Sequence, residues 1–156
     1  MIENRRVISV IVVNEASVLA RIAGLFAARG YNIESLTVAP IPESKYSRIT
    51  IATSGDARMM EQIVKQLHKL IPVLKVIEHD AQVEKEMALV KFPIAQSLAD
   101  IDALCHAYNG KIVNVGTDVI IGMVADEPQR VGYFLEAVKN FNPIEIVRSG
   151  VVALER

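Results

Sequence analysis

The chain contains 156 residues, of which 51% are hydrophobic and 22% are charged, with 17 basic and 18 acidic side chains. This composition excludes a disordered protein and favours an oligomer that buries apolar surface between subunits. The formal charge of -1 makes nucleic acid and anionic membranes poor partners, because no overall field attracts the chain to either. Its one cysteine, Cys105, cannot form an internal disulfide, which favours a reducing cytoplasm.

The first half of the chain predicts the order strand, helix, strand, strand, helix, strand. A β-branched run begins the chain, and although its basic start superficially resembles a secretion signal, it indicates a buried strand too short to span a bilayer. Gly30 is expected to stop the first helix, and Asp56 and Pro72 to cap and end the second. The six elements are expected at residues 5–13, 17–29, 31–39, 47–53, 57–71 and 73–77.

The same order is repeated after a polar stretch, residues 78–86, which is predicted to be a linker. Ser97 and Asp126 are expected to cap the two helices of this half. The six elements are expected at residues 87–92, 98–108, 111–115, 119–124, 127–142 and 144–154. We therefore predict an α+β protein of two tandem ferredoxin-like βαββαβ domains, residues 1–80 and 81–156, with a single larger domain as the alternative.

The chemical groups that an enzyme would need are sparse. His68, His79 and His106 have no cysteine or serine at a spacing that suggests a nucleophile and its base, so we interpret them as surface histidines. Cys105 falls on the apolar stripe of its predicted helix, where a buried hydrophobic role is expected. The sequence contains no glycine-rich phosphate-binding loop, carboxylate pair or metal-ligand cluster. We therefore predict no catalytic residues and no metal site in this chain.

Two asparagines at element boundaries suit a small ligand. Asn14 lies where the first strand meets the first helix, and Asn32 opens the second strand. A helix N-terminus presents unpaired N–H groups and the positive end of the helix dipole, which suit the carboxylate of a free amino acid. The alternative is that both asparagines only serve turns, as asparagine often does.

Longer motifs extend over nearly the whole chain. Two of them run from Val13-Asn14-Glu15 through Gly24-Leu25-Phe26 and from Arg29-Gly30-Tyr31 through Thr37-Val38-Ala39. Shorter ones are Ser47-Arg48-x-Thr50, residues 62–70 and the terminal Arg148-Ser149-Gly150-Val151-Val152. Together these motifs resemble the small, regulatory subunit of acetolactate synthase (acetohydroxyacid synthase), whose first domain is an ACT domain.

The resemblance implies a non-catalytic subunit that works in branched-chain amino acid biosynthesis. Such a subunit forms a homodimer or higher homo-oligomer in the cytoplasm, binds the catalytic large subunit, raises its activity and confers feedback inhibition by valine. Thiamine diphosphate, magnesium and FAD then belong to the catalytic subunit, which converts pyruvate to acetolactate, and this chain holds no cofactor. The implied valine site lies at the seam between two ACT domains, with Asn14, Ser17, Val18 and Leu19 from one protomer and Asn32 and Ile33 from the other.

One departure from the family concerns Ser17, where glycine is usual. Serine adds a Cβ and a hydroxyl, which either crowd valine or cap the helix. An amino-acid-sensing ACT protein that regulates another target is the closest alternative function. A nucleic-acid-binding module would need aromatic residues where Ile8, Val10 and Ile51 stand, and an acylphosphatase-like enzyme would need a phosphate-binding loop after the first strand.

Overall fold

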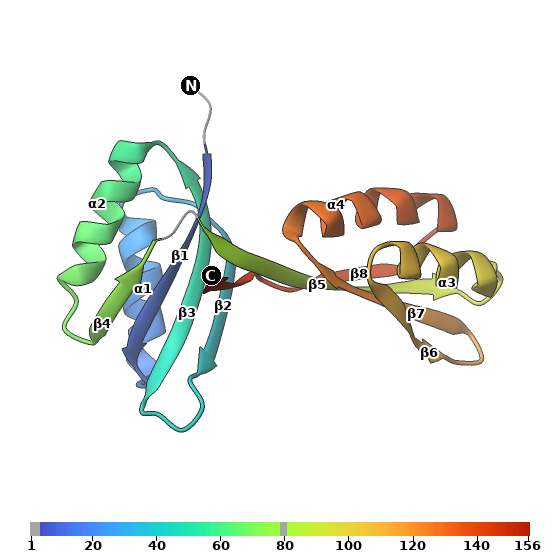
Figure 1. Cartoon of the computed structure of the whole chain (residues 1–156), viewed down its shortest axis with the longest axis horizontal. Helices are drawn as coiled ribbons and strands as arrows, with labels where there is room; N and C mark the ends of the chain where they lie inside the picture. The colour runs from blue at the N-terminus through green and yellow to red at the C-terminus, as the bar shows by residue number, and fades with distance from the viewer. Residues whose placement is uncertain (1–3, 79–80) are drawn as a thin grey trace. The chain divides into compact units, whose positions relative to one another are not determined.

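A computed structural model describes residues 4–78 and 81–156 of the chain (Figure 1). The chain forms two compact units, Met1–Val83 with Ala153–Arg156 and Glu84–Val152, and each is described by itself. The predicted domain boundary between residues 80 and 81 stays a prediction, but the end of the chain belongs to the first unit and not to the second. His79, in the predicted linker, lies outside the described residues.

The first unit has the predicted order of strands and helices. Its elements are β1 (Asn4–Val13), α1 (Ala16–Ala28), β2 (Ile33–Pro40), β3 (Tyr46–Gly55), α2 (Ala57–His68) and β4 (Val73–Ile77). The strands form one sheet in the order β2-β3-β1-β4, and every neighbouring pair is antiparallel. Both helices cover the same face of this sheet (Figure 1). The ferredoxin-like fold predicted for this half of the chain is confirmed.

The core of the first unit lies between its sheet and its two helices. Side chains alternate between the faces of β1 and β3, so every second residue faces the helices. Apolar residues at helical spacing on α1 and α2 meet them. The buried members of this core are Ile8, Val10, Val12, Ile49, Ile51, Val18, Ile22, Phe26, Met60, Ile63 and Leu67.

Local signals mark the end of α1 and the start of α2. Gly30 has a φ of +70°, a left-handed conformation that favours glycine, and α1 ends shortly before it. The Asp56 carboxylate accepts a hydrogen bond of 2.8 Å from the Met59 N–H at the start of α2. The predicted stop of α1 and the predicted cap of α2 are therefore confirmed.

The second face of the first sheet carries small and polar side chains. Ser9, Thr50 and Ala52 are buried there, on the side opposite the helices. Arg48 donates from Nη2 to Ser9 Oγ at 3.0 Å and to the carbonyl oxygen of Ala153 at 2.7 Å. Because Ala153 lies in β9 (Val152–Glu155) and belongs to the first unit, the C-terminal strand helps to cover this face.

The second unit repeats the βαββαβ order. Its elements are β5 (Gln82–Pro93), α3 (Leu98–Ala107), β6 (Gly110–Val115), β7 (Val119–Asp126), α4 (Pro128–Ala137), the 3-10 helix η1 (Val138–Phe141) and β8 (Glu145–Arg148). The strand order β6-β7-β5-β8 corresponds to that of the first unit, and β9 pairs with β5. Ser97 caps α3 as predicted, because its hydroxyl accepts a hydrogen bond from the Asp100 N–H at 3.3 Å.

Three local predictions for this half are wrong. The polar residues 82–86 begin β5 and do not form a linker, because the buried carboxylate of Glu86 is paired with Arg148. The expected long last strand is two strands, β8 and β9. Asp126 does not cap α4: it ends β7, and Glu127 occupies the cap position without a side-chain hydrogen bond to the helix.

Asp126 is buried and joins β5, the turn before β6 and α4. Its carboxylate accepts hydrogen bonds from Lys85 Nζ at 3.1 Å, Asn109 Nδ2 at 2.9 Å and Arg130 Nε at 2.7 Å. The Glu127 N–H donates to the same carboxylate at 2.8 Å. Burial by itself raises the pKa of Asp126, but these hydrogen bonds outweigh it and hold the pKa well below the usual range. The carboxylate is therefore ionised at neutral pH.

Candidate functional site

The turn between β1 and α1 offers backbone donors that no side chain caps. Glu15 precedes α1 in an extended conformation and makes no side-chain hydrogen bond to the helix. Within the described chain, the first turn of α1 contains no acidic residue, whereas Asp56 and Ser97 cap α2 and α3. The Val18 N–H donates to the carbonyl oxygen of Glu15 at 3.2 Å, so the N–H groups of Ala16 and Ser17 are the ones that can donate to the carboxylate of a ligand. The helix dipole adds to the attraction.

The backbone of this turn is held in place by its neighbours. The Val13 N–H donates to the carbonyl oxygen of Pro72, and the Asn14 N–H donates to that of Lys45, both at 3.0 Å. The side chains of Asn14 and Ser17 are exposed. The turn therefore presents two polar side chains from a fixed backbone.

The apolar residues of the predicted site are less exposed. Val18 is only 2% exposed and belongs to the core, so its side chain supports the turn from behind. Leu19 and Ile33 are half-buried and pack against the same core. They leave part of their aliphatic surface open to a ligand.

Asn32 lies just before β2, with an exposed side chain. Its carbonyl oxygen accepts a hydrogen bond from Oγ1 of Thr53, which is buried near the end of β3. The side-chain amide of Asn32 is thus presented from a fixed backbone, as that of Asn14 is.

A single chain does not bring Asn14 and Asn32 together. Asn14 is held to Lys45, which precedes β3, and Asn32 is held to Thr53 near the other end of that strand. A strand rises about 3.3 Å per residue, which puts roughly 25 Å between the two contacts. Both asparagines can line one site only if a second copy of the chain supplies one of them.

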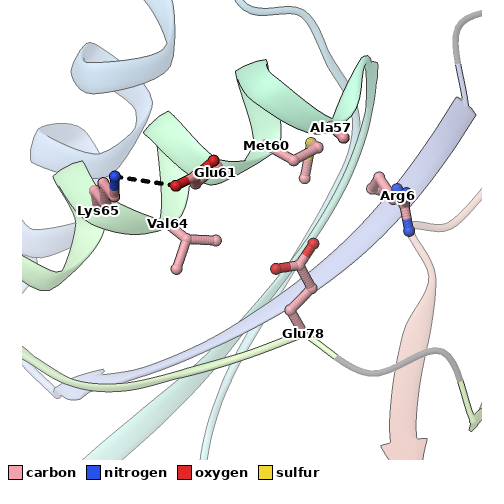
Figure 2. Close-up of a pocket in the computed structure, with 7 residues that line it drawn as sticks. All are labelled: Arg6, Ala57, Met60, Glu61, Val64, Lys65 and Glu78. Carbon is pink, nitrogen blue, oxygen red and sulfur yellow. Dashed lines mark ion pairs between the residues drawn. The ribbon is translucent and has the colours of Figure 1, made fainter.

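A cavity of about 310 Å³ lies at the other end of the first unit (Figure 2). Lys65 and Glu61, one helical turn apart on α2, form an exposed ion pair of 3.0 Å at this cavity. The lining residues are Arg6, Ala57, Met60, Glu61, Val64, Lys65 and Glu78. None of them is a predicted site residue, so this cavity is separate from the turn at Asn14.

The cysteine and the two histidines that the structure describes show no arrangement typical of a nucleophile, a general base or a metal site. Cys105 is buried, as predicted, and burial, with a smaller contribution from the nearby Asp102 carboxylate, raises the pKa of its thiol to about 11. His68 and His106 are exposed on α2 and α3. Among residues 4–78 and 81–156, no cluster of histidine, cysteine, aspartate or glutamate could hold a metal ion. No helix in this part of the chain is long and apolar enough to cross a membrane.

The terminal motif that begins at Arg148 has a structural role that the sequence does not indicate. Arg148 pairs with the buried Glu86 and donates from Nη2 to the carbonyl oxygen of Pro128 at 3.0 Å. The Ser149 N–H donates to the carbonyl oxygen of Met87, and the Ser149 hydroxyl accepts from the Met87 N–H, both at 2.8 Å. The motif therefore fixes the end of β8 against β5.

The fold and the family models that the two units match define the class of this protein. Residues 8–75 match the family model of the AHAS small subunit-like ACT domain, so the first unit is an ACT domain. Residues 85–156 match the family model of the small subunit of acetolactate synthase. The chain therefore belongs to the family of acetolactate synthase small subunits.

Individual relatives extend this likeness over both units. The chain is 42% identical over 156 residues to the acetolactate synthase isozyme 3 small subunit of Escherichia coli strain K12, which covers 97% of the chain and 96% of the relative. It is 40% identical, with 97% and 96% coverage, to the acetolactate synthase small subunit of Haemophilus influenzae. The crystal structure of the small subunit from Thermotoga maritima superposes with a TM-score of 0.89 at 34% identity and covers 98% of each chain.

Proposed function

We propose that this chain is the regulatory subunit of acetolactate synthase, that it binds and activates the catalytic subunit, and that it makes the enzyme sensitive to valine. The likeness to acetolactate synthase small subunits supports this role because it runs through both units. The proposal assigns the conversion of pyruvate, with thiamine diphosphate, magnesium and FAD, to the catalytic subunit. This chain then supplies regulation and binds no cofactor.

The open edge of the first sheet supports a homodimer. Within the described sheet β2 pairs with β3 alone, and Leu36 and Val38 on it are 36% and 42% exposed. Proteins normally pair or cover such an edge strand. Antiparallel pairing of two β2 strands sets the beginning of one beside the end of the other, and it brings Asn32 of one protomer toward Asn14 of the partner subunit.

The separation of Asn14 and Asn32 within one chain is the observation that supports a site shared between two protomers. In the dimer, the first N–H groups of α1 donate to the carboxylate of valine, and the asparagine amides orient its polar end. Leu19 and Ile33 contact the aliphatic side chain, while Val18 supports the turn from the core. Ser17 lies in the first turn of α1, where its hydroxyl and Cβ border the ligand.

Reconstitution tests this function directly. The full-length protein is mixed with the catalytic subunit of acetolactate synthase, and acetolactate formation is measured with and without valine. We expect the protein to raise the rate and valine to remove most of that increase. An unchanged rate would contradict the regulatory role, and activation without valine sensitivity would contradict the effector site alone. Valine binding without any effect on the catalytic subunit would favour an amino-acid-sensing ACT protein with another target.

The oligomeric state is tested separately by sedimentation of the protein alone at micromolar concentration. We expect a homodimer or a larger homo-oligomer, with valine increasing the fraction of assembled protein because it contacts two protomers. A monomer of 17.2 kDa in the presence of valine would contradict the shared site.

A further inference from the structure

The turn between α2 and β4 exposes large apolar side chains. Ile71 is 93% exposed and Leu74 is 60% exposed. Residues 69–75, which we term the α2–β4 turn, lie at the end of the first unit where β1 finishes and α1 begins (Figure 1). Ile71 is the most exposed of the large apolar side chains described, and with Leu74 it forms a small apolar patch of the kind that a partner can cover.

A β-bulge accounts for the exposure of Leu74. In the pairing of β4 with β1, Lys75 lies opposite Ile11 and Val73 lies opposite Val12, so Leu74 is the extra residue between them. Val73 packs against the core of the unit, whereas Leu74 remains mostly in solvent. Bulges of this kind direct a side chain away from the sheet and interrupt an edge strand. The exposure of Leu74 is therefore built into the backbone.

Two lysines flank these two side chains in the sequence. Lys69 and Lys75 are both exposed, and neither forms an ion pair with a described residue. Lys65, one helical turn before Lys69, is by contrast paired with Glu61. A surface with two apolar side chains between unpaired lysines fits an apolar pocket with carboxylates around it.

The α2–β4 turn is also bonded to the turn that holds Asn14. The carbonyl oxygen of Pro72 accepts the hydrogen bond from the Val13 N–H, one residue before Asn14. A ligand that shifts the backbone at Asn14 therefore acts on the α2–β4 turn through one hydrogen bond.

We propose that the α2–β4 turn docks on the catalytic subunit of acetolactate synthase, with Ile71 and Leu74 entering an apolar pocket edged by carboxylates. This inference rests on the proposed function, which supplies the partner. Full burial of one isoleucine side chain corresponds to about a tenfold to hundredfold gain in affinity. The lysines add a contribution that salt weakens, because exposed charges are screened.

The test compares variants of the full-length chain in binding to the immobilised catalytic subunit and in activating it. We expect the double variant Ile71→Ser/Leu74→Ser to bind at least tenfold more weakly than the wild type, and Ile71→Leu to bind normally. The matched control is Ile144→Ser, which changes an isoleucine that is 57% exposed in the second unit. Circular dichroism and valine titration of each variant establish that the fold and the effector site are intact.

A second pair of measurements examines charge. We expect Lys69→Glu/Lys75→Glu to weaken binding at least tenfold at low ionic strength, with a smaller difference at high salt. Binding of the Ile71→Ser/Leu74→Ser variant within twofold of the wild type would overturn the docking surface, and so would an equal loss in Ile144→Ser. If the wild type itself neither binds nor activates the catalytic subunit, the proposed function fails and the docking surface fails with it.

Discussion

Removal of the Asp126 carboxylate is expected to destabilise the second unit selectively. Asp126→Ala loses four charge-assisted hydrogen bonds, because the carboxylate that accepts them is ionised. The donors are charged in Arg130 and Lys85 and neutral in Asn109 and the Glu127 N–H. A hydrogen bond to a charged group contributes about 1.5–3 kcal/mol, but removing the carboxylate also removes the cost of burying its charge. Arg130 and Lys85 are 43% and 48% exposed, so solvent screening brings their contributions to the low end or below it. We expect a total loss of about 3–4 kcal/mol in the free energy of unfolding of this unit.

Urea unfolding followed by circular dichroism gives the overall loss, and hydrogen exchange localises it. Amides of β7 and α4 should lose protection in Asp126→Ala, while those of β1 and α2 keep theirs. Lys85→Met is the matched control, because it removes one exposed partner and leaves the carboxylate paired with Arg130 and Asn109. A loss below about 1 kcal/mol in the free energy of unfolding would refute the claim that this carboxylate stabilises the second unit, and so would an equal loss of protection in both units.

The contribution of Asp126 also depends on pH in a defined direction. Its pKa is lower in the folded protein than in the unfolded chain, where it is about 4. The contribution is therefore fully present above the unfolded pKa and is lost as the pH falls through the folded pKa. The stability difference between the wild type and Asp126→Asn should be constant from about pH 6 to 8 and shrink below about pH 4. A difference that stays constant down to strongly acid pH would contradict this.

Three further predictions concern the effector site and the first unit. Asn32→Ala and Asn14→Ala each remove ligand hydrogen bonds worth about 0.5–1.5 kcal/mol, so isothermal titration should show roughly a tenfold loss of valine affinity with activation retained. Unchanged affinity in both variants would move the effector site elsewhere. Ser17→Gly opens the approach to the backbone and should leave valine inhibition equal or stronger; weaker inhibition would instead assign a binding role to the hydroxyl. A fragment that ends at Ile77 keeps the four-stranded sheet and both helices, and it should fold and activate the catalytic subunit at least partly, with valine control or full activation lost. Its melting temperature should fall because Arg48 loses its contact with Ala153, and an unfolded fragment would show that the two halves share one core.

Patterns within short stretches of the sequence predicted most of the fold. The alternation in β3 and the helical spacing of Met60, Ile63 and Leu67 depend only on neighbouring residues, and both match the structure. Gly30 and Asp56 mark helix boundaries for equally local reasons, a left-handed conformation and a side-chain cap. Such signals need no knowledge of the rest of the chain.

Two of the wrong predictions, those for Glu86 and Asp126, share a cause in pairing over long sequence separations. Glu86 lies in a polar stretch that is typical of a linker. In the structure its carboxylate is buried in the sheet and paired with Arg148, which lies 62 residues further along the chain. Asp126 precedes a proline and a helix as a cap would, but Asn109 and Lys85 hold it in β7. No local pattern contains these partners, so the sequence could not assign either residue correctly.

The candidate site was predicted in part. The asparagines lie at element boundaries, which the sequence shows, but their separation along β3 is a property of the sheet order. The exposure of Ile71 and Leu74 was not predicted, because an apolar pair after a helix is also typical of a buried strand. Their exposure follows from the bulge between β4 and β1, which depends on the register of two distant strands.

The covering of the first sheet by β9 bears on how the protein is made. A ribosome delivers the N-terminal domain first, and such domains generally fold before the rest of the chain has emerged. Here Ala153 reaches Arg48 only after the whole second unit has been synthesised, so the first domain completes its second face late in translation. A premature stop codon anywhere between the first unit and Ala153 would therefore weaken the domain that was synthesised first.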